Sequence, residues 1–327
     1  PPPPPDPVPT DGIWISQAEI MALPMSGAGW TDVLAAAKAA SGATSLSNQD
    51  SDDSTKVMAA ALVYVRTGET AYLNKVTKAI TDICTKNLES GSRALALGRE
   101  LIGYVLAADI VQLKTILPDL DAKWRTKLTA LLTYKTSQAG SLIDCSLDRP
   151  NNWGGHSRAS WLAGALYLGD KTGADKAVAT LKGWMGDWDA YNGFTYGDMA
   201  WQIDKSKPVG VLPKGATIQG YNVDGGQPEE LRRVAFKIPP SNVVYTWEGL
   251  QGPIAACVMA ERAGYDAWNW CDKAMLRAVD FNYRQGWAAE GDDKWIVPII
   301  NRAYGVNLPA TGGGAGKNVG WTLWTHQ

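Results

Sequence analysis

The chain has 327 residues, of which 45% are hydrophobic and 20% are charged, and its formal net charge is −2 at pH 7. That length suits one large domain or two of ordinary size. The near-neutral charge gives no reason to expect nucleic acid or an anionic membrane as a partner, and no apolar run is long enough to span a bilayer. An acidic ligand would have to be bound by a local group of arginine and lysine residues.

The aromatic residues are unevenly chosen, with 15 Trp and 12 Tyr against 3 Phe. Trp and Tyr offer flat apolar faces with a polar group at the edge, which suit the C–H faces of sugar rings, although wide helical cores use Trp as well. No CxxC pair is present and the two histidines lie apart from the cysteines, so neither a structural metal nor a cofactor is predicted. Two disulfides or free buried thiols are both compatible with the four cysteines, which are Cys84, Cys145, Cys257 and Cys271.

The start of the chain is rich in proline, with seven among the first nine residues. This composition predicts an extended linker or tail over residues 1–12, followed by a single domain over residues 13–327. Ser16 and Glu19 form an S-x-x-E capping box, which predicts the first helix. Thr31 is predicted to cap a second, alanine-rich helix.

The chain continues as a polar loop and then as pairs of helices. The polar stretch 41–54 is predicted to be the surface loop. Apolar periodicity predicts helices over residues 56–66, 71–86, 94–113, 118–136, 158–168, 174–188, 247–263 and 267–284. Similar joints at Gly68 and Gly264 form a weak internal repeat. Some of these helices, such as 94–113, are apolar on more than one face and should be buried between others.

These features predict an all-α fold with two concentric layers of helices, an incomplete (α/α) toroid. A short-loop bundle would not need the long break between residues 191 and 226, and such a break inside a compact domain is more often functional than accidental. Within it, residues 201–203 and 209–212 are predicted to pair as a small β-hairpin.

The first stretch with chemical character runs from Arg149 through Pro150 to His156. Proline disfavours helical geometry at the preceding residue, so we predict a loop that leads into the next helix. The side-chain amide of Asn152 can donate hydrogen bonds without carrying charge, and His156 is a candidate general base or second donor. Ordinary turn chemistry for Asn151 and Asn152 and a structural role for the histidine are the alternatives.

The second stretch runs from Pro228 to Tyr245 and contains Arg232 and Arg233. A tyrosine just before a long helix can stand at the wall of a groove, where a nearby positive charge favours the phenolate form. Such a tyrosine can act as a base and, after proton transfer, as an acid. The alternative is an aromatic side chain packed in a helix layer.

Taken together, these stretches resemble the alginate lyases with an α/α-toroid fold. Asn151-Asn152 followed by a histidine is similar to their Asn-Asn-His motif, and the block from Pro228 is similar to their P-x-E-x-x-R segment. The continuation resembles their Tyr…Pro…Ala-Glu…Gly helix, with the matching residues Tyr245, Pro253, Ala260, Glu261 and Gly264. The resemblance covers roughly residues 55 to 290, in the family's order and spacing.

The resemblance implies β-elimination on a 1,4-linked uronate polysaccharide such as alginate or glucuronan. By position, Asn152 and Arg233 would neutralise the uronate carboxylate, Tyr245 would be the catalytic acid and base, and His156 would match the motif histidine. Further substrate contacts are expected from basic, amide and aromatic side chains, namely Arg93, Arg149, Asn151 and Trp153. We expect a secreted or periplasmic monomer whose partner is an anionic polysaccharide.

Two departures from the family pattern concern the substrate more than the reaction. Trp153-Gly154-Gly155 separates the paired asparagines from His156, which is expected to reach the motif position through a glycine turn if it keeps its role. Residues 237–241 lengthen the segment between Arg233 and Tyr245.

Two other functional classes remain open from the sequence. One is a glycoside hydrolase on a similar toroid, which needs two carboxylates at a defined separation, with Asp187, Asp189 and Asp198 as candidates. The other is a non-catalytic carbohydrate-binding protein that uses its tryptophans as sugar platforms.

Overall fold

The computed structural model describes residues 11–310 and 312–326. The fold within these ranges is mostly helical, with one two-stranded antiparallel sheet, as expected for an all-α chain. Most of the proline-rich tail predicted over residues 1–12 lies outside the described residues. No helix among the described residues is both long and apolar enough to cross a membrane.

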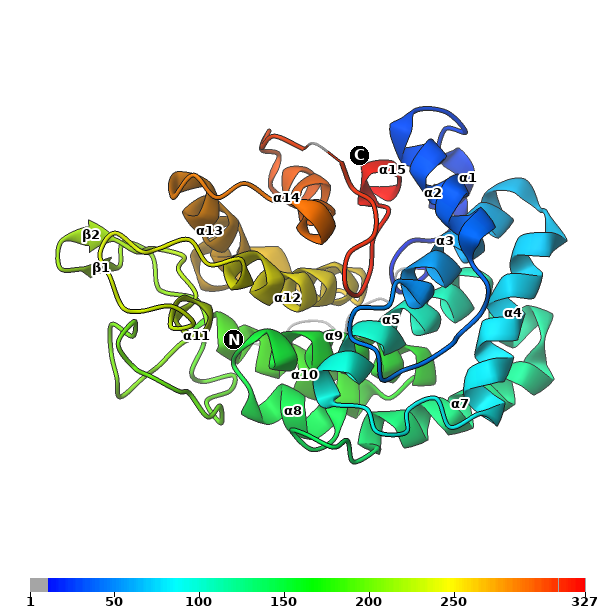
Figure 1. The fold of residues 1–327 in the computed structure, drawn as a ribbon, viewed down its shortest axis with the longest axis horizontal. Helices are drawn as coiled ribbons and strands as arrows, with labels where there is room; N and C mark the ends of the chain where they lie inside the picture. The colour runs from blue at the N-terminus through cyan, green and yellow to red at the C-terminus, as the bar shows by residue number, and fades with distance from the viewer. Residues whose placement is uncertain (1–10, 311, 327) are drawn as a thin grey trace.

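Four long helices lie side by side through the middle of the molecule (Figure 1), and we call them the inner helices. They are α3 (Asp53–Thr67), α5 (Ala94–Ile110), α9 (Asn152–Leu168) and α12 (Tyr245–Arg262). Their burial follows from sequences that are apolar or small on every face. In α5, for example, every residue except Asp109 is buried.

Four further helices pack against the inner set and alternate with it along the chain. They are α4 (Thr70–Thr85), α7 (Pro118–Thr133), α10 (Lys171–Met185) and α13 (Trp270–Arg284). These outer helices are amphipathic: α4 buries Tyr72, Val76, Ala79 and Ile83 at helical spacing and exposes its polar face.

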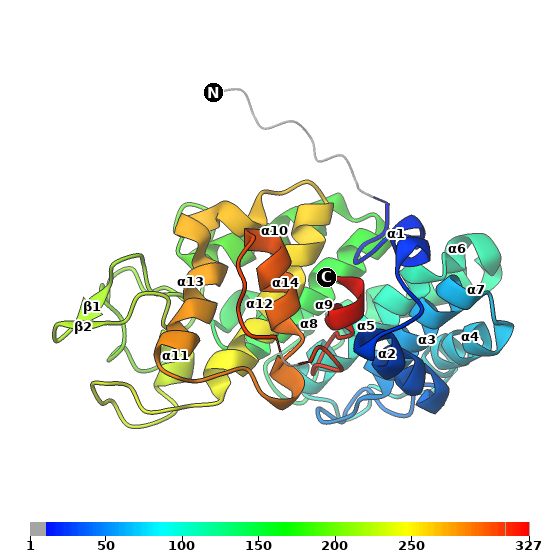
Figure 2. The same ribbon diagram turned by 90° about the horizontal axis from the view of Figure 1, so that it is seen from above.

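Short helices and two 3-10 turns complete the fold (Figures 1 and 2). They are α1 (Gln17–Ala22), α2 (Ala28–Ala39), α6 (Leu113–Ile116), α8 (Leu142–Asp148), α11 (Pro228–Leu231), η1 (Ala267–Asn269), η2 (Gly291–Asp293), α14 (Ile296–Tyr304) and α15 (Thr322–Thr325). The capping box at the start of α1 is confirmed, since Ser16 and Glu19 each accept the other's backbone N–H. Helix α2 begins before the predicted Thr31, whose hydroxyl instead bonds to the Gly27 carbonyl oxygen.

The inner helices all run in the same direction, as contacts of their C-terminal ends with one N-terminal segment, residues 11–23, show. Arg66 Nε at the end of α3 donates to the Leu23 carbonyl, and Arg262 Nε at the end of α12 donates to the Gly12 carbonyl, each at 2.8 Å. Near the end of α5, Asp109 Oδ2 accepts the Ile13 N–H at 2.8 Å. At the end of α9, Leu166 lines a small cavity together with Ile13 and Asp109. The N-terminal ends of the inner helices therefore lie together at the opposite end.

Glycines allow the inner helices to touch backbone to backbone. A Cβ atom on Gly98 of α5 would lie 2.9 Å from the Ser157 nitrogen of α9, and one on Gly252 of α12 would overlap the Gly155 carbonyl of α9. Real Cβ atoms essentially never approach so closely. These contacts fix how α5, α9 and α12 sit beside one another.

The long loop does contain a small β-hairpin, as predicted, but its strands are not the predicted residues 201–203 and 209–212. The strands are β1 (Thr217–Ile218) and β2 (Tyr221–Asn222), joined by Gln219 and Gly220, both with positive φ, the geometry of a type I′ turn. This hairpin projects at one end of the molecule (Figures 1 and 2). In the predicted position, the Gln202 side-chain amide takes the place of a second strand. It donates to the Val209 carbonyl at 2.9 Å and accepts from the Val209 N–H at 3.0 Å.

All four cysteines are free thiols. Cys145 and Cys257 are buried, and Cys84 and Cys271 are half-buried. Of the two states that the sequence allows, the structure therefore contains the unpaired one.

Candidate functional site

The Asn151–His156 stretch is helical from its second residue, so the predicted loop is wrong. Asn151 caps α9, its Oδ1 accepting the Trp153 N–H at 3.2 Å, and Asn152 is the first residue of the helix. This cap lets the helix start directly after Pro150. A Cβ on Gly154 would overlap the Arg149 carbonyl oxygen, so glycine is required for this tight start.

The early start of α9 sets the position of His156. Asn152 and His156 are four residues apart in the helix and so share one face, one turn from each other. There is no glycine turn that brings His156 to the level of the asparagines. On α12, Tyr245 and Glu248 are likewise one turn apart.

Asn152, Arg233 and Tyr245 come together at the N-terminal ends of α9 and α12, and we call them the Asn–Arg–Tyr trio. Arg233 Nη2 donates to Asn152 Oδ1 over a long 3.4 Å. The Arg233 guanidinium carbon lies 4.6 Å from the centre of the Tyr245 ring, within the range of a cation–π contact. Tyr245 keeps 38% of its surface exposed. Asn152 thus meets Arg233, 81 residues later in the chain, and through it Tyr245, so that three residues predicted as catalytic form one contact group.

Arg233 of the trio lines a cationic pocket of about 500 Å³. Its lining comprises Gln138, Ala139, Arg149, Asn151, Trp153, Arg232 and Arg233. No acidic side chain among the described residues lines it. Three guanidinium groups and one indole in a single hollow can bind a carboxylate and a sugar face.

Arg232 is held in place from behind by a buried carboxylate. Glu229 is 2% exposed, and its Oε2 accepts from Arg232 Nε at 2.8 Å and from Nη2 at 2.7 Å. The other oxygen of Glu229 accepts the Gly197 N–H at 2.8 Å. The long loop before α12 is therefore tied to the pocket through one carboxylate.

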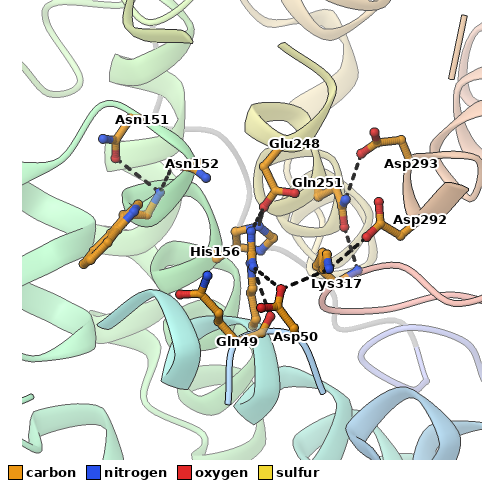
Figure 3. Close-up of polar contacts among 12 residues, drawn as sticks. Gln49, Asp50, Asn151, Asn152, His156, Glu248, Gln251, Asp292, Asp293 and Lys317 are labelled. Carbon is orange, nitrogen blue, oxygen red and sulfur yellow. Dashed lines mark hydrogen bonds and ion pairs between the residues drawn. The ribbon is translucent and has the colours of Figure 1, made fainter. Parts of the chain in front are cut away.

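A buried triad of Arg99, His156 and Glu248 lies one helical turn from the trio, with one residue from each of α5, α9 and α12. Figure 3 shows His156 and Glu248 of this triad facing each other. His156 Nε2 is 2.8 Å from Glu248 Oε1, which Arg99 Nη2 also contacts. Burial alone would raise the pKa of Glu248, but the hydrogen bond from His156 and the positive charge of Arg99 lower it to about 2. Glu248 is therefore a nearly buried carboxylate, with 12% of its side chain exposed, that stays ionised.

His156 does not reach the pocket, because its side chain is 0% exposed. Burial lowers the pKa of the imidazole although the Glu248 carboxylate opposes this effect. The ring is therefore neutral near pH 7, and its Nδ1 has no hydrogen-bond partner among the described residues. In this geometry His156 contacts Glu248 and not the pocket.

Glu230 is a buried residue of the site to which sequence reasoning gave no role. Its Oε1 accepts the Asn152 backbone N–H at 2.6 Å, and its Oε2 lies 3.6 Å from Arg233 Nε. Burial raises the pKa of Glu230 to about 7, despite the opposing effects of Arg233 and the Asn152 N–H. The sequence did contain a signal for this residue, since Glu230 is the glutamate of the segment that resembles P-x-E-x-x-R.

A chain of polar contacts extends from the buried triad to the C-terminal segment (Figure 3). Lys317 Nζ lies 3.3 Å from Asp50 and 3.2 Å from Asp292, and the Lys317 N–H donates to Gln251 Oε1 at 2.8 Å. Burial raises the pKa of Asp293, which accepts from Gln251, to about 8. Lys317 therefore links the loop before α3, the η2 turn and α12.

Among the predicted substrate contacts, Arg149, Asn151 and Trp153 line the pocket, whereas Arg93 is not part of its lining. Arg93 stands at the start of α5 and donates from Nη2 to Gln49 Oε1 at 2.8 Å.

The aspartates considered for a hydrolase serve local turns. Asp187 Oδ1 accepts the Asp189 and Ala190 N–H groups at 3.1 Å each, and its Oδ2 pairs with Lys182 at 2.8 Å. Asp198 accepts the Ala200 N–H at 2.9 Å. These contacts give Asp187 and Asp198 a structural explanation without a reaction.

No group of three or more His, Cys, Asp or Glu side chains suited to a metal ion is found in the described part of the chain. Comparison with known proteins identifies no family model, no curated protein and no solved structure that matches this chain. The function therefore has to be argued from the geometry of the site.

Proposed function

We propose that the protein is a polysaccharide lyase that cleaves a 1,4-linked uronate polysaccharide by β-elimination. The observation that carries this proposal is the Asn–Arg–Tyr trio at the edge of a pocket with three arginines. An amide, a guanidinium and a phenol are the groups that this reaction needs at one carbon atom. The resemblance of the same residues to α/α-toroid alginate lyases supports it.

The carboxylate must be neutralised first, because the C5 proton of a uronate is very weakly acidic while the adjacent group is already negative. The Asn152 side-chain nitrogen donates to no described residue, and Arg233 faces the pocket. Arg233 can therefore donate directly to the substrate carboxylate as it gains enolate character, and Asn152, which is only 2% exposed, would donate from beside Arg233 at the inner side of the site. Preorganised donors of this kind contribute about 3–4 kcal/mol each.

Tyr245 then transfers the proton. Its phenolate takes the C5 proton, the freed electron pair forms the C4–C5 double bond, and the bond between C4 and the glycosidic oxygen breaks. The leaving oxygen takes the proton back from the phenol, so no water is consumed. General acid–base catalysis of this type accounts for roughly 10²- to 10⁴-fold in rate.

The fold is compatible with this function. We interpret the parallel inner helices and the alternating outer helices as an incomplete (α/α) toroid that forms one catalytic domain over residues 13–327. The proposal requires no metal ion or cofactor, and it places a monomeric protein outside the cytoplasm, where such polymers occur.

The test is a panel of poly-mannuronate, poly-guluronate, glucuronan, hyaluronan and pectate, monitored for the ultraviolet absorbance of an unsaturated uronate. We expect this absorbance to rise with at least one of the first three polymers. New reducing ends without the absorbance would favour a hydrolase. Binding without any product over long incubation would favour a carbohydrate-binding protein.

A further inference from the structure

Glu230 touches both groups that are proposed to neutralise the substrate carboxylate. Its Oε1 accepts from the backbone of Asn152 at 2.6 Å, and its Oε2 is 3.6 Å from Arg233 Nε. Its side chain also packs against Gly249 on the first turn of α12, where an added Cβ would lie 2.8 Å from Glu230 Cγ. Glu230 therefore stands between α9 and α12, directly behind the trio, and is 1% exposed.

The surroundings of Glu230 make its charge costly. Arg233 at 3.6 Å and its neighbour Arg232 are the cations that act on it, both from the same segment, and Asn152 of α9 offers one N–H donor. Two other carboxylates oppose it, Glu229 from its own segment and Glu248 from α12. The hydrogen-bonding capacity of Oε2 is unused among the described residues. A buried carboxylate with one cation at 3.6 Å and two like charges nearby is close to balance between its two protonation states.

We propose that Glu230 is a positioning residue of the site and that it takes up one proton when an anionic sugar binds to Asn152 and Arg233; this inference rests on the proposed function. A bound uronate brings a further negative charge to Arg233 and competes for its guanidinium. A nearby like charge disfavours the ionised form of a carboxyl group. Glu230 then becomes neutral, and the full charge of Arg233 acts on the substrate.

The protonation state of Glu230 before binding determines how the affinity for an anionic sugar depends on pH. Its pKa is about 7 before binding, so below pH 7 the group is already protonated and binding takes up little. Above pH 7 binding must recruit the proton, so affinity falls by up to about tenfold per pH unit. Neutral sugars should bind without this dependence.

Calorimetry can measure the proton directly. Oligomers of poly-mannuronate and of glucuronan are titrated into Tyr245→Phe protein at pH 6 and pH 8, in phosphate and in Tris, whose ionisation enthalpies differ. We expect an uptake approaching one proton per site at pH 8 and little at pH 6. The Tyr245→Phe background prevents turnover during the titration.

Variants of two neighbouring glutamates separate this role from a structural one. Glu230→Gln keeps an acceptor for the Asn152 N–H but cannot ionise, so we expect no proton uptake and an affinity independent of pH. Glu229→Gln is the matched control: it loosens Arg232 and lowers affinity, yet the proton uptake at pH 8 should remain.

Binding without proton uptake at pH 8, or uptake that persists in Glu230→Gln, would overturn this inference and leave the proposed function intact. Failure of both oligomers to bind would count against the proposed function itself and against the inference with it. If Glu230→Gln does not fold, a lack of proton uptake at pH 8 in the protein with Glu230 present still overturns the inference.

Discussion

At the scale of single residues, the site contains side chains that can contact a substrate and side chains that position these substrate-contacting groups. Arg233 links both sets, because it stacks on the Tyr245 ring, contacts Asn152 and pairs loosely with Glu230. His156 and Glu248 lie one helical turn deeper, with side chains that are 0% and 12% exposed. The division assigns proton transfer to Tyr245 and positioning to the buried residues.

Removing the phenol or the amide should abolish most of the activity. We expect Tyr245→Phe and Asn152→Ala each to lower kcat by roughly 10²-fold or more. Steady-state measurement of unsaturated product tests this. Tyr221→Phe serves as the control and should keep normal turnover. Tyr221 lies in the projecting hairpin, and its hydroxyl donates to Gln285 at the end of α13. Near-normal turnover in Tyr245→Phe would exclude that residue from proton transfer.

The Glu248 carboxylate should stabilise the fold in a way that depends on pH. Its pKa is about 2 in the folded state and near 4.5 when unfolded, so its ionisation favours folding above pH 4.5. This stabilisation is lost as the pH falls towards 2. Glu248→Gln removes the nearer of the two carboxylates that pair with Arg99, the other being Asp50 at 3.8 Å, and should cost about 3 kcal/mol at pH 7.

Urea unfolding of both proteins at several pH values checks the expectation for Glu248. The difference in unfolding free energy between the unmodified protein and Glu248→Gln should shrink steadily between pH 5 and pH 2. A difference that stays constant over this range would show that the charge of Glu248 has no such effect.

At the scale of helices, the glycine contact between α9 and α12 decides how far Asn152 stands from Tyr245. In Gly252→Ala, the new methyl group would overlap the Gly155 carbonyl, so the two helices must move apart. We expect a loss of roughly 1–3 kcal/mol in stability and a kcat reduced by about 10²-fold, because small displacements at a reaction centre are costly.

Gly169→Ala is the matched control for this variant. Gly169 ends α9 with a φ of +70° and has open space around its Cβ position, so alanine there should cost about 1–2 kcal/mol and leave kcat unchanged. Equal kcat values for the two alanine variants would argue against a role of the α9–α12 contact in catalysis.

Helices with clear periodicity could be predicted from the sequence, because their signals are local. The α5 prediction over residues 94–113 has the correct start and ends three residues late. The start of α9 could not be placed as well. Pro150 indicated a break, and the helix begins at once because Asn151 caps it and Glu230, 78 residues away, accepts the Asn152 N–H. Contacts between segments so distant in sequence leave no local pattern.

The long loop shows the same limit. The predicted pairing of residues 201–203 with 209–212 brought the right segments together, yet a glutamine side chain makes the contact instead of a strand. The true hairpin turn uses Gln219 before Gly220, where the common signal has asparagine or aspartate. In the site, the motifs identified the trio, whereas the Lys317 contacts depend on the packing of three loops and could not be predicted.

At the scale of the whole molecule, the site and the N-terminal segment occupy opposite ends of the inner helices. Residues 11–23 contact the C-terminal ends of α3, α5 and α12, and the trio lies at the N-terminal ends of α9 and α12. The C-terminal segment meanwhile reaches the site end, since Lys317 contacts Asp50 and Asp292. Beyond Lys317 the chain returns to the N-terminal part of the fold, where Trp324 Nε1 donates to the Pro24 carbonyl at 2.8 Å and His326 packs on Trp14.

The common direction of the inner helices has an electrostatic consequence. Each helix carries a dipole equivalent to about half a positive charge at its N-terminus, and four of these ends point towards the same region. An anionic polymer is thus attracted there although the net charge of the protein is −2. Salt screens such fields within roughly 10 Å at 0.1 M.

We therefore expect kcat/KM to fall several-fold, roughly, between 20 mM and 500 mM salt while kcat at saturation stays constant. Arg149→Ala should reduce this salt dependence without removing it, because the dipoles of the four helices remain. A kcat/KM that does not respond to salt would mean that the aligned backbone of the inner helices does not help to capture the substrate.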